Sequence, residues 1–119
     1  MSTRKSTTAL VLFACLFLGQ PTRAQDVSSA NSNLAGCKAI LTNAQGTFSQ
    51  GICAGSVYTM LFVGYRLRQD TSFCPPVNVT IEQGIRVLVQ YLESQPQNLH
   101  ENFQGLMLRS FRDAWPCSR

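Results

Sequence analysis

Cysteines are the side chains in this sequence that are best suited to chemistry. Four of them lie outside the apolar N-terminal segment: Cys37, Cys53, Cys74 and Cys117. No two of these four have the close spacing of a zinc knuckle, and His100 is the single histidine of the sequence. Their even number is typical of a disulfide framework in a small exported protein. We therefore predict two disulfides and no metal site.

Other candidates for catalysis are few. His100 could in principle face Ser94 or Ser110, but a catalytic triad also needs an oxyanion-binding site, so a solvated or helix-capping histidine is the simpler interpretation. Glu82 and Glu93 are expected on the exposed side of one helix. The sequence holds no Gly-rich phosphate loop, no G-x-S-x-G and no H-E-x-x-H motif. We therefore expect no enzymatic activity and no cofactor.

The segment over residues 1–24 has the features of a secretory signal peptide. Arg4 and Lys5 form a basic start, an apolar run follows over residues 8–19, and Ala24 supplies a small residue at the expected cleavage site. The apolar run is shorter than the roughly 20 residues that span a bilayer. We expect cleavage after Ala24, which discards Cys15, and export to the periplasm without membrane insertion.

The formal net charge of +4 belongs mostly to this N-terminal segment. Three of the ten cations, Arg4, Lys5 and Arg23, precede the cleavage site, whereas all six carboxylates follow it. The mature chain therefore keeps seven cations against six carboxylates, a net charge near +1. Its cations form no dense stripe with interleaved aromatic residues, so nothing predicts a nucleic-acid partner.

The mature chain is expected to be all-α. A polar, aperiodic lead-in over residues 25–33 is expected to be flexible. Beyond it, apolar residues recur at steps of three and four in four segments, at about 34–44, 50–68, 81–92 and 99–114. Asn33 is the expected N-cap of the first helix, and Thr80 with Gln83 forms a capping-box sequence before the third. The pattern predicts one compact domain over residues 34–119, a small bundle of four helices or slightly more, stapled by two disulfides.

The expected helices also limit how the cysteines can pair. A helix of about 16 residues is about 24 Å long, so Cys53 and Cys74, at opposite ends of the second helix, cannot reach the Cα separation of roughly 7 Å that a bridge needs. The third and fourth helices go out and back, which places Cys74 and Cys117 at the same end. The favoured pairs are Cys37 with Cys53 and Cys74 with Cys117.

A series of short motifs resembles the Rap/Tai family of immunity proteins over most of the mature chain. The motifs are NLAGC at 33–37, CAG at 53–55, FCP at 73–75, VTIEQ at 79–83, YLESQP at 91–96 and WPC at 115–117. The resemblance implies a small helical fold, often a homodimer, that inhibits a secreted peptidoglycan amidase of type VI secretion by inserting a loop into its active-site groove. It also implies a periplasmic location.

A different function considered for the same sequence is that of a stand-alone periplasmic protein similar to small acid-stress chaperones. Such proteins unfold when their carboxylates titrate. Six carboxylates and one histidine offer few groups for acid to switch, and two disulfides oppose unfolding. The sequence therefore favours the immunity protein over the chaperone.

The expected partner-binding segment is the loop that follows the second helix. Its polar residues are Arg66, Arg68, Gln69, Asp70, Thr71 and Ser72. Cys74 and the stiff Pro75-Pro76 pair anchor its far end, and an anchored loop loses less entropy when it docks. The connection over residues 95–101, which contains His100, ranks second.

Overall fold

The computed structural model describes residues 28–118, so the predicted signal peptide over residues 1–24 lies outside the described residues. The described chain forms four α-helices: α1 (Ala30–Leu41), α2 (Phe48–Val63), α3 (Ile81–Ser94) and α4 (Phe103–Ala114). Two short 3-10 turns, η1 (Gly64–Arg66) and η2 (Pro96–Asn98), follow α2 and α3. The only β pairing within residues 28–118 is an isolated bridge between Ser29 and Asn102. The predicted all-α class is confirmed.

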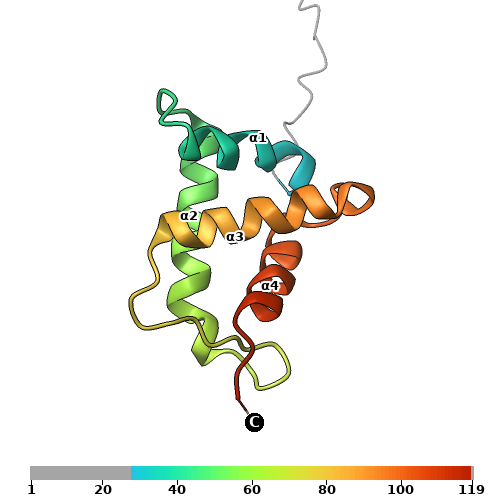
Figure 1. The fold of residues 1–119 in the computed structure, drawn as a ribbon. Helices are drawn as coiled ribbons and strands as arrows, with labels where there is room; N and C mark the ends of the chain where they lie inside the picture. The colour runs from blue at the N-terminus through green and yellow to red at the C-terminus, as the bar shows by residue number, and fades with distance from the viewer. Residues whose placement is uncertain (1–27, 119) are drawn as a thin grey trace, which may run out of the picture.

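The helices are arranged around α2, which runs along the length of the molecule (Figure 1). α1 lies at the N-terminal end of α2, α3 crosses it, and α4 packs beside α3. The crossing of α2 and α3 is close at Gly84, where an added Cβ would lie 2.9 Å from Cγ1 of Val57. The predicted four-helix bundle is thus confirmed, in a form in which α3 crosses α2 instead of running along it.

The core lies between the inner faces of these helices. α3 contributes Ile85, Leu88, Val89 and Leu92, and α4 contributes Phe103, Leu106, Met107 and Phe111. The apolar stripe predicted for the third helix is therefore buried from Ile85 onward, while Ile81 at its start remains 40% exposed.

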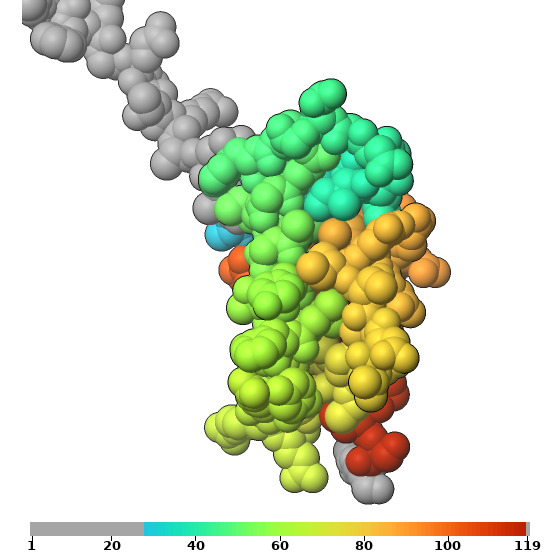
Figure 2. Space-filling view, turned by 90° about the vertical axis from the view of Figure 1, so that its left-hand side faces the viewer, coloured from blue at the N-terminus to red at the C-terminus, as the bar shows by residue number. Residues whose placement is uncertain are grey.

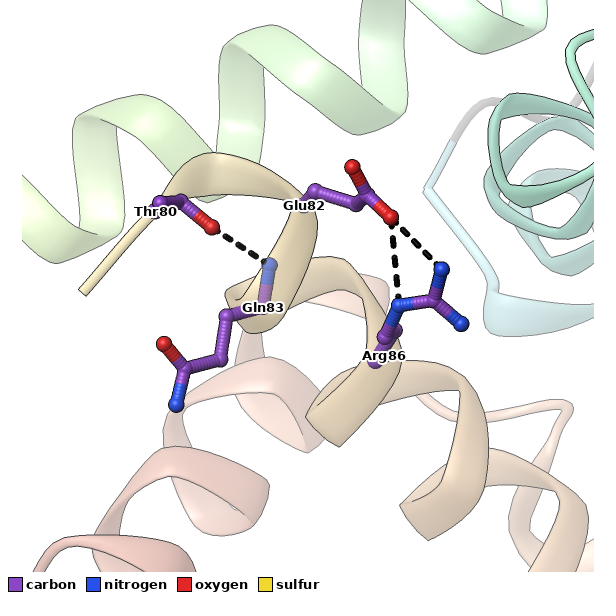
Figure 3. A network of polar contacts seen from close by, with 4 residues as sticks. All are labelled: Thr80, Glu82, Gln83 and Arg86. Atoms are coloured by element: carbon purple, nitrogen blue, oxygen red, sulfur yellow. Dashed lines mark hydrogen bonds and ion pairs between the residues drawn. The ribbon is translucent and has the colours of Figure 1, made fainter.

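The N-terminal caps fix where the helices begin. Thr80 accepts a hydrogen bond from the backbone N–H of Gln83 at 3.1 Å and starts α3 as predicted, whereas the Gln83 side chain points away from Thr80 (Figure 3). A complete capping box instead starts α2, between Thr47 and Gln50. α2 therefore begins at Phe48, two residues before the predicted start, and gives way to η1 after Val63, before the predicted end at residue 68.

α1 begins four residues earlier than predicted. Ser29, not Asn33, is its N-cap, and Asn33 lies buried in the first turn with its side-chain amide donating to the carbonyl of Ser29. The segment before it is held by backbone bonds from Ala30 to the carbonyl of Glu101 and from Phe103 to that of Ser28. The prediction of a flexible lead-in up to residue 33 was therefore wrong for its last residues.

Both predicted disulfides are present. Cys37 in α1 is bonded to Cys53 in α2 with a Cα separation of 5.4 Å. Cys74 is bonded to Cys117 beyond the end of α4, with a Cα separation of 4.9 Å. The first bond ties α1 to α2, and the second ties the segment before α3 to the C-terminal end of the chain.

Candidate functional site

The predicted binding loop follows η1, and its hydrogen bonds converge on the backbone carbonyl group of Arg68. The carbonyl oxygen of Arg68 accepts hydrogen bonds from the backbone N–H groups of Thr71 at 2.8 Å and Ser72 at 2.7 Å, and from Oγ1 of Thr71 at 3.1 Å. Oγ of Ser72 donates to the carbonyl of Gln69 at 3.3 Å. These short-range bonds hold residues 68–72 in a closed turn, so the loop has a defined shape in the isolated chain.

Phe73 anchors the far end of this loop in the core. Its side chain is fully buried, and its ring centroid lies 5.3 Å from that of Phe111 in α4. Gly64 leaves room for the ring, since an added Cβ there would lie 2.2 Å from the Phe73 ring. The next residue, Cys74, donates its backbone N–H to the carbonyl of Trp115 at 2.8 Å and belongs to the second disulfide. The loop is thus held by the core, a backbone bond and a covalent bond.

A surface hollow of about 1100 Å³ lies between this loop and the end of α4. From the loop, its lining includes Arg68, Gln69, Asp70 and Ser72. α4 contributes Arg109, Arg112 and Asp113, and residues 116–118 complete the rim. The lining carries three guanidinium groups and two carboxylates, which suits a polar partner surface with charges of both signs.

Two ion pairs involve residues that line this hollow, one largely exposed and one in which Glu101 is partly buried. Nε of Arg68 lies 3.5 Å from Oδ1 of Asp70, and the two side chains are 88% and 67% exposed. Arg109 forms a second pair with Glu101 at 2.8 Å. Exposed pairs of this kind contribute only about 0 to 1 kcal/mol to stability, so their charges can turn to a partner at little cost to the fold.

The structure separates Arg66 from the other residues of the predicted site. Its guanidinium carbon lies 4.8 Å from the ring centroid of Phe62 and 5.1 Å from that of Tyr65. Arg66 therefore belongs with the outer side of α2 and does not line the hollow. Thr71 stays within the closed turn, where it is half-buried.

His100 is also separate from the loop. It lies before the start of α4, whereas the α4 residues that line the hollow, from Arg109 onward, lie in the second half of this helix. The serines considered as its partners act within their own helices: Oγ of Ser94 donates to the carbonyl of Tyr91, and Oγ of buried Ser110 donates to that of Met107.

The described part of the chain offers no group of three or more His, Cys, Asp or Glu side chains that could hold a metal ion. Its helices are also too short, or too polar, to cross a membrane. What the surface does offer is the polar hollow and, on α2, a set of exposed aromatic side chains.

Two features of this surface were missed by the sequence analysis. The α4 residues of the hollow could have been found from the predicted bond between Cys74 and Cys117, because Arg109 and Arg112 lie in the last turns before Cys117. The exposure of the aromatic side chains in and next to the second helix was not predicted. Phe48, Tyr58, Phe62 and Tyr65 are in fact 53 to 69% exposed.

The fold and its surface define a small, disulfide-bridged, all-helical protein with a polar hollow and exposed aromatic side chains. The model of the Rap1a immunity protein family matches residues 15–117, and the chain belongs to this family. Neither the curated proteins nor the solved structures gave a match to this chain. Family membership suggests a role in immunity to a type VI effector and implies that the chain binds a partner effector protein. Immunity proteins of this kind are generally not enzymes and are typically periplasmic.

Proposed function

We propose that this chain is a periplasmic immunity protein that binds and inhibits a peptidoglycan amidase effector of type VI secretion, and so protects the cell wall of the producing cell. Membership in the Rap1a family supports the immunity role. The observation that carries the inhibitory mechanism is the loop over residues 66–73, which is closed on the Arg68 carbonyl and pinned by buried Phe73. A loop ordered in advance loses less conformational entropy when it enters an enzyme groove.

Export to the periplasm is part of the proposal. The predicted signal peptide over residues 1–24 would direct the chain across the inner membrane, and cleavage after Ala24 would release the helical domain. The two disulfides suit this route, because disulfides persist in oxidising compartments such as the periplasm. An amidase that attacks peptidoglycan would meet its inhibitor in the same compartment.

The test is inhibition of a small Cys/His amidase encoded beside the gene of this chain, measured as the rate of peptidoglycan hydrolysis. Replacing Arg68, Gln69 and Asp70 together by alanine is expected to weaken inhibition by at least about tenfold, which corresponds to about 1.4 kcal/mol of lost binding energy. The thermal midpoint should change little, because these side chains are exposed.

A matched control is available on α3, where Glu82, Arg86 and Gln90 are exposed and repeat the composition of the loop triad. Replacing these three by alanine removes one acid, one base and one amide away from the hollow, and inhibition is expected to be unchanged. Full inhibition by the loop variant would place the contact surface elsewhere. Failure of the unmodified protein to inhibit the amidase would contradict the proposed function itself.

A further inference from the structure

The two disulfides of the protein differ in their exposure to solvent. Cys37 and Cys53 are fully buried, and their bond belongs to the core between α1 and α2. Cys74 is exposed and Cys117 is half-buried, so the bond between them lies at the surface. A reductant breaks a disulfide by direct attack of its thiolate on one sulfur, and a bond at the surface permits this attack in the folded protein. Exposed disulfides are accordingly the labile or regulatory ones.

Residues 116–118, which we call the C-terminal strap, form part of the rim of the hollow. In Figure 2 the end of the chain, in red, reaches the surface at the lower end of the molecule, which also carries the loop after α2. Sγ of Cys117 lies 3.8 Å from Oγ of Ser72 in this loop. Apart from that contact and the disulfide, the strap makes no hydrogen bond, ion pair or ring contact with the rest of residues 28–118. The disulfide is therefore its main attachment.

The segments that flank the strap and the loop have further attachments. The Trp115 ring centroid lies 5.3 Å from that of Phe111, and Phe73 is buried in the core. The backbone N–H of Cys74 donates to the carbonyl of Trp115 at 2.8 Å. Opening the disulfide would thus free the strap and remove one of three attachments of the loop, but it would leave these contacts in place. Because Trp115 is only two residues before Cys117, the two thiols would keep a high effective concentration and could bond again.

We propose that the Cys74–Cys117 disulfide is a redox switch at the hollow, which a dithiol reductant opens in the folded protein while the Cys37–Cys53 bond stays intact. A thiolate of the reductant attacks one sulfur of the bond, and the other sulfur leaves as a thiolate and takes up a proton. The second thiol of the reductant then attacks the reductant's own sulfur in the mixed disulfide and releases the second cysteine as a thiol. Two electrons and two protons pass to the protein, and the reductant becomes a disulfide.

The redox switch would regulate the inhibition of the amidase, and in this respect it rests on the proposed function. In the oxidised protein the strap and the loop are ordered before a partner docks at the hollow. In the reduced protein they would have to be ordered on binding, and this ordering lowers the affinity. We therefore expect inhibition to weaken by at least about tenfold when the bond is reduced, and to return when it forms again.

The first test compares the reduction of the two bonds in oxidised protein, isolated from cells that express the full chain. The protein is treated with dithiothreitol, the free thiols are blocked with iodoacetamide, and tryptic peptides, each with one of the four cysteines, are analysed by mass spectrometry. Cys74 and Cys117 should be modified at least about tenfold faster than Cys37 and Cys53, because the buried bond becomes accessible only when the fold opens. In urea that unfolds the protein, the difference should vanish. Equal rates in the folded protein would overturn the proposal.

A second test examines the release of the strap by NMR. After selective reduction, the order parameters of the backbone N–H groups of Cys117 and Ser118 should fall below about 0.6, the range of flexible backbone. Those of α1 and α2 should stay near about 0.85, the value of rigid backbone, and serve as the internal control. The variant that combines Cys74→Ser with Cys117→Ser should show the same flexible strap without any reductant. A strap that is equally ordered in the oxidised and the reduced protein would overturn the proposal.

The third test measures inhibition of the amidase by oxidised, reduced and reoxidised protein after removal of the reductant. The double variant is the matched control, because reductant should not change its weak inhibition. If that variant does not fold, the loss and recovery of inhibition by the unmodified protein still decide the question. Selective reduction with unchanged inhibition would overturn the switch. Oxidised protein without any inhibition would instead contradict the proposed function, which the reduction rates and order parameters do not involve.

Discussion

Thr80 is the N-cap of α3, and its Oγ1 accepts the backbone N–H of Gln83 at 3.1 Å (Figure 3). Thr80→Ala removes this acceptor and is expected to lower the free energy of unfolding by about 0.5 to 2 kcal/mol. The measurement is the midpoint of thermal or urea unfolding. Gln83→Ala is the control, because the Gln83 side chain does not return to the cap, and it should change stability by less than about 0.5 kcal/mol. An unchanged midpoint for Thr80→Ala would mean that the cap contributes nothing.

Gly64 is the residue against which the Phe73 ring is packed. A Cβ at this position would lie 2.2 Å from the ring, which is itself buried against Phe111 and has no room to withdraw. Gly64→Ala should therefore destabilise the protein by roughly 1 to 3 kcal/mol through overpacking, and should also displace the binding loop. Gly105→Ala in α4 is the control. Its Cβ would make only ordinary contacts, so the gain in helix propensity should raise stability by roughly 0.5 to 1 kcal/mol. Urea unfolding of both variants distinguishes the two effects.

At the scale of the elements, the two disulfides stabilise different parts of the molecule. Cys37 and Cys53 are separated by 16 residues and join α1 to α2, whereas Cys74 and Cys117 are separated by 43 residues, and Cys117 lines the hollow. In the chain-entropy model, replacing both cysteines of a bond by serine costs about 3 kcal/mol for the first bond and about 4 kcal/mol for the second.

The two disulfide variants should differ more in their inhibition of the amidase than in their free energy of unfolding. Loss of the Cys74–Cys117 bond is expected to weaken inhibition of the amidase, because it frees the loop and the rim of the hollow. Loss of the Cys37–Cys53 bond should leave inhibition by the folded protein intact. Inhibition assays below the unfolding midpoint of both variants make the comparison. Equal loss of inhibition in the two would show that the second bond has no special role at the hollow.

The helices were predictable where their signals are local. Thr80 and the apolar steps from Ile85 to Leu92 lie within or directly before one helix, and they placed α3 correctly. The start of α1 depends instead on backbone bonds between residues 28–31 and 99–103, which are far apart in the sequence. Periodicity carries no information about such pairings, so the polar residues before Leu34 were taken for a flexible segment.

At the scale of the whole molecule, the predicted loop was found at a hollow, but the side of that hollow formed by α4 and the C-terminal residues was not predicted. Arg109, Arg112 and Asp113 line it because the end of α4 lies close to Cys74. In the sequence, only the predicted bond between Cys74 and Cys117 indicated this arrangement. His100 was included with the polar connection over residues 95–101, the second-ranked segment, and lies before the start of α4. The exposed aromatic side chains Phe48, Tyr58, Phe62 and Tyr65 were missed because the sequence of one chain does not show which face of an apolar helix is left uncovered.

The order of the cysteines has a consequence for the biosynthesis of the protein. The bonds join Cys37 to Cys53 and Cys74 to Cys117, so the two covalent loops follow one another without overlap. On the proposed export route, Cys37 and Cys53 enter the periplasm before Cys74 and Cys117. A thiol oxidase that joins cysteines as they emerge would thus form the native pairs directly. We expect the protein to reach normal levels in a strain without a disulfide isomerase and to fail in one without the oxidase, as measured by the amount of fully oxidised protein.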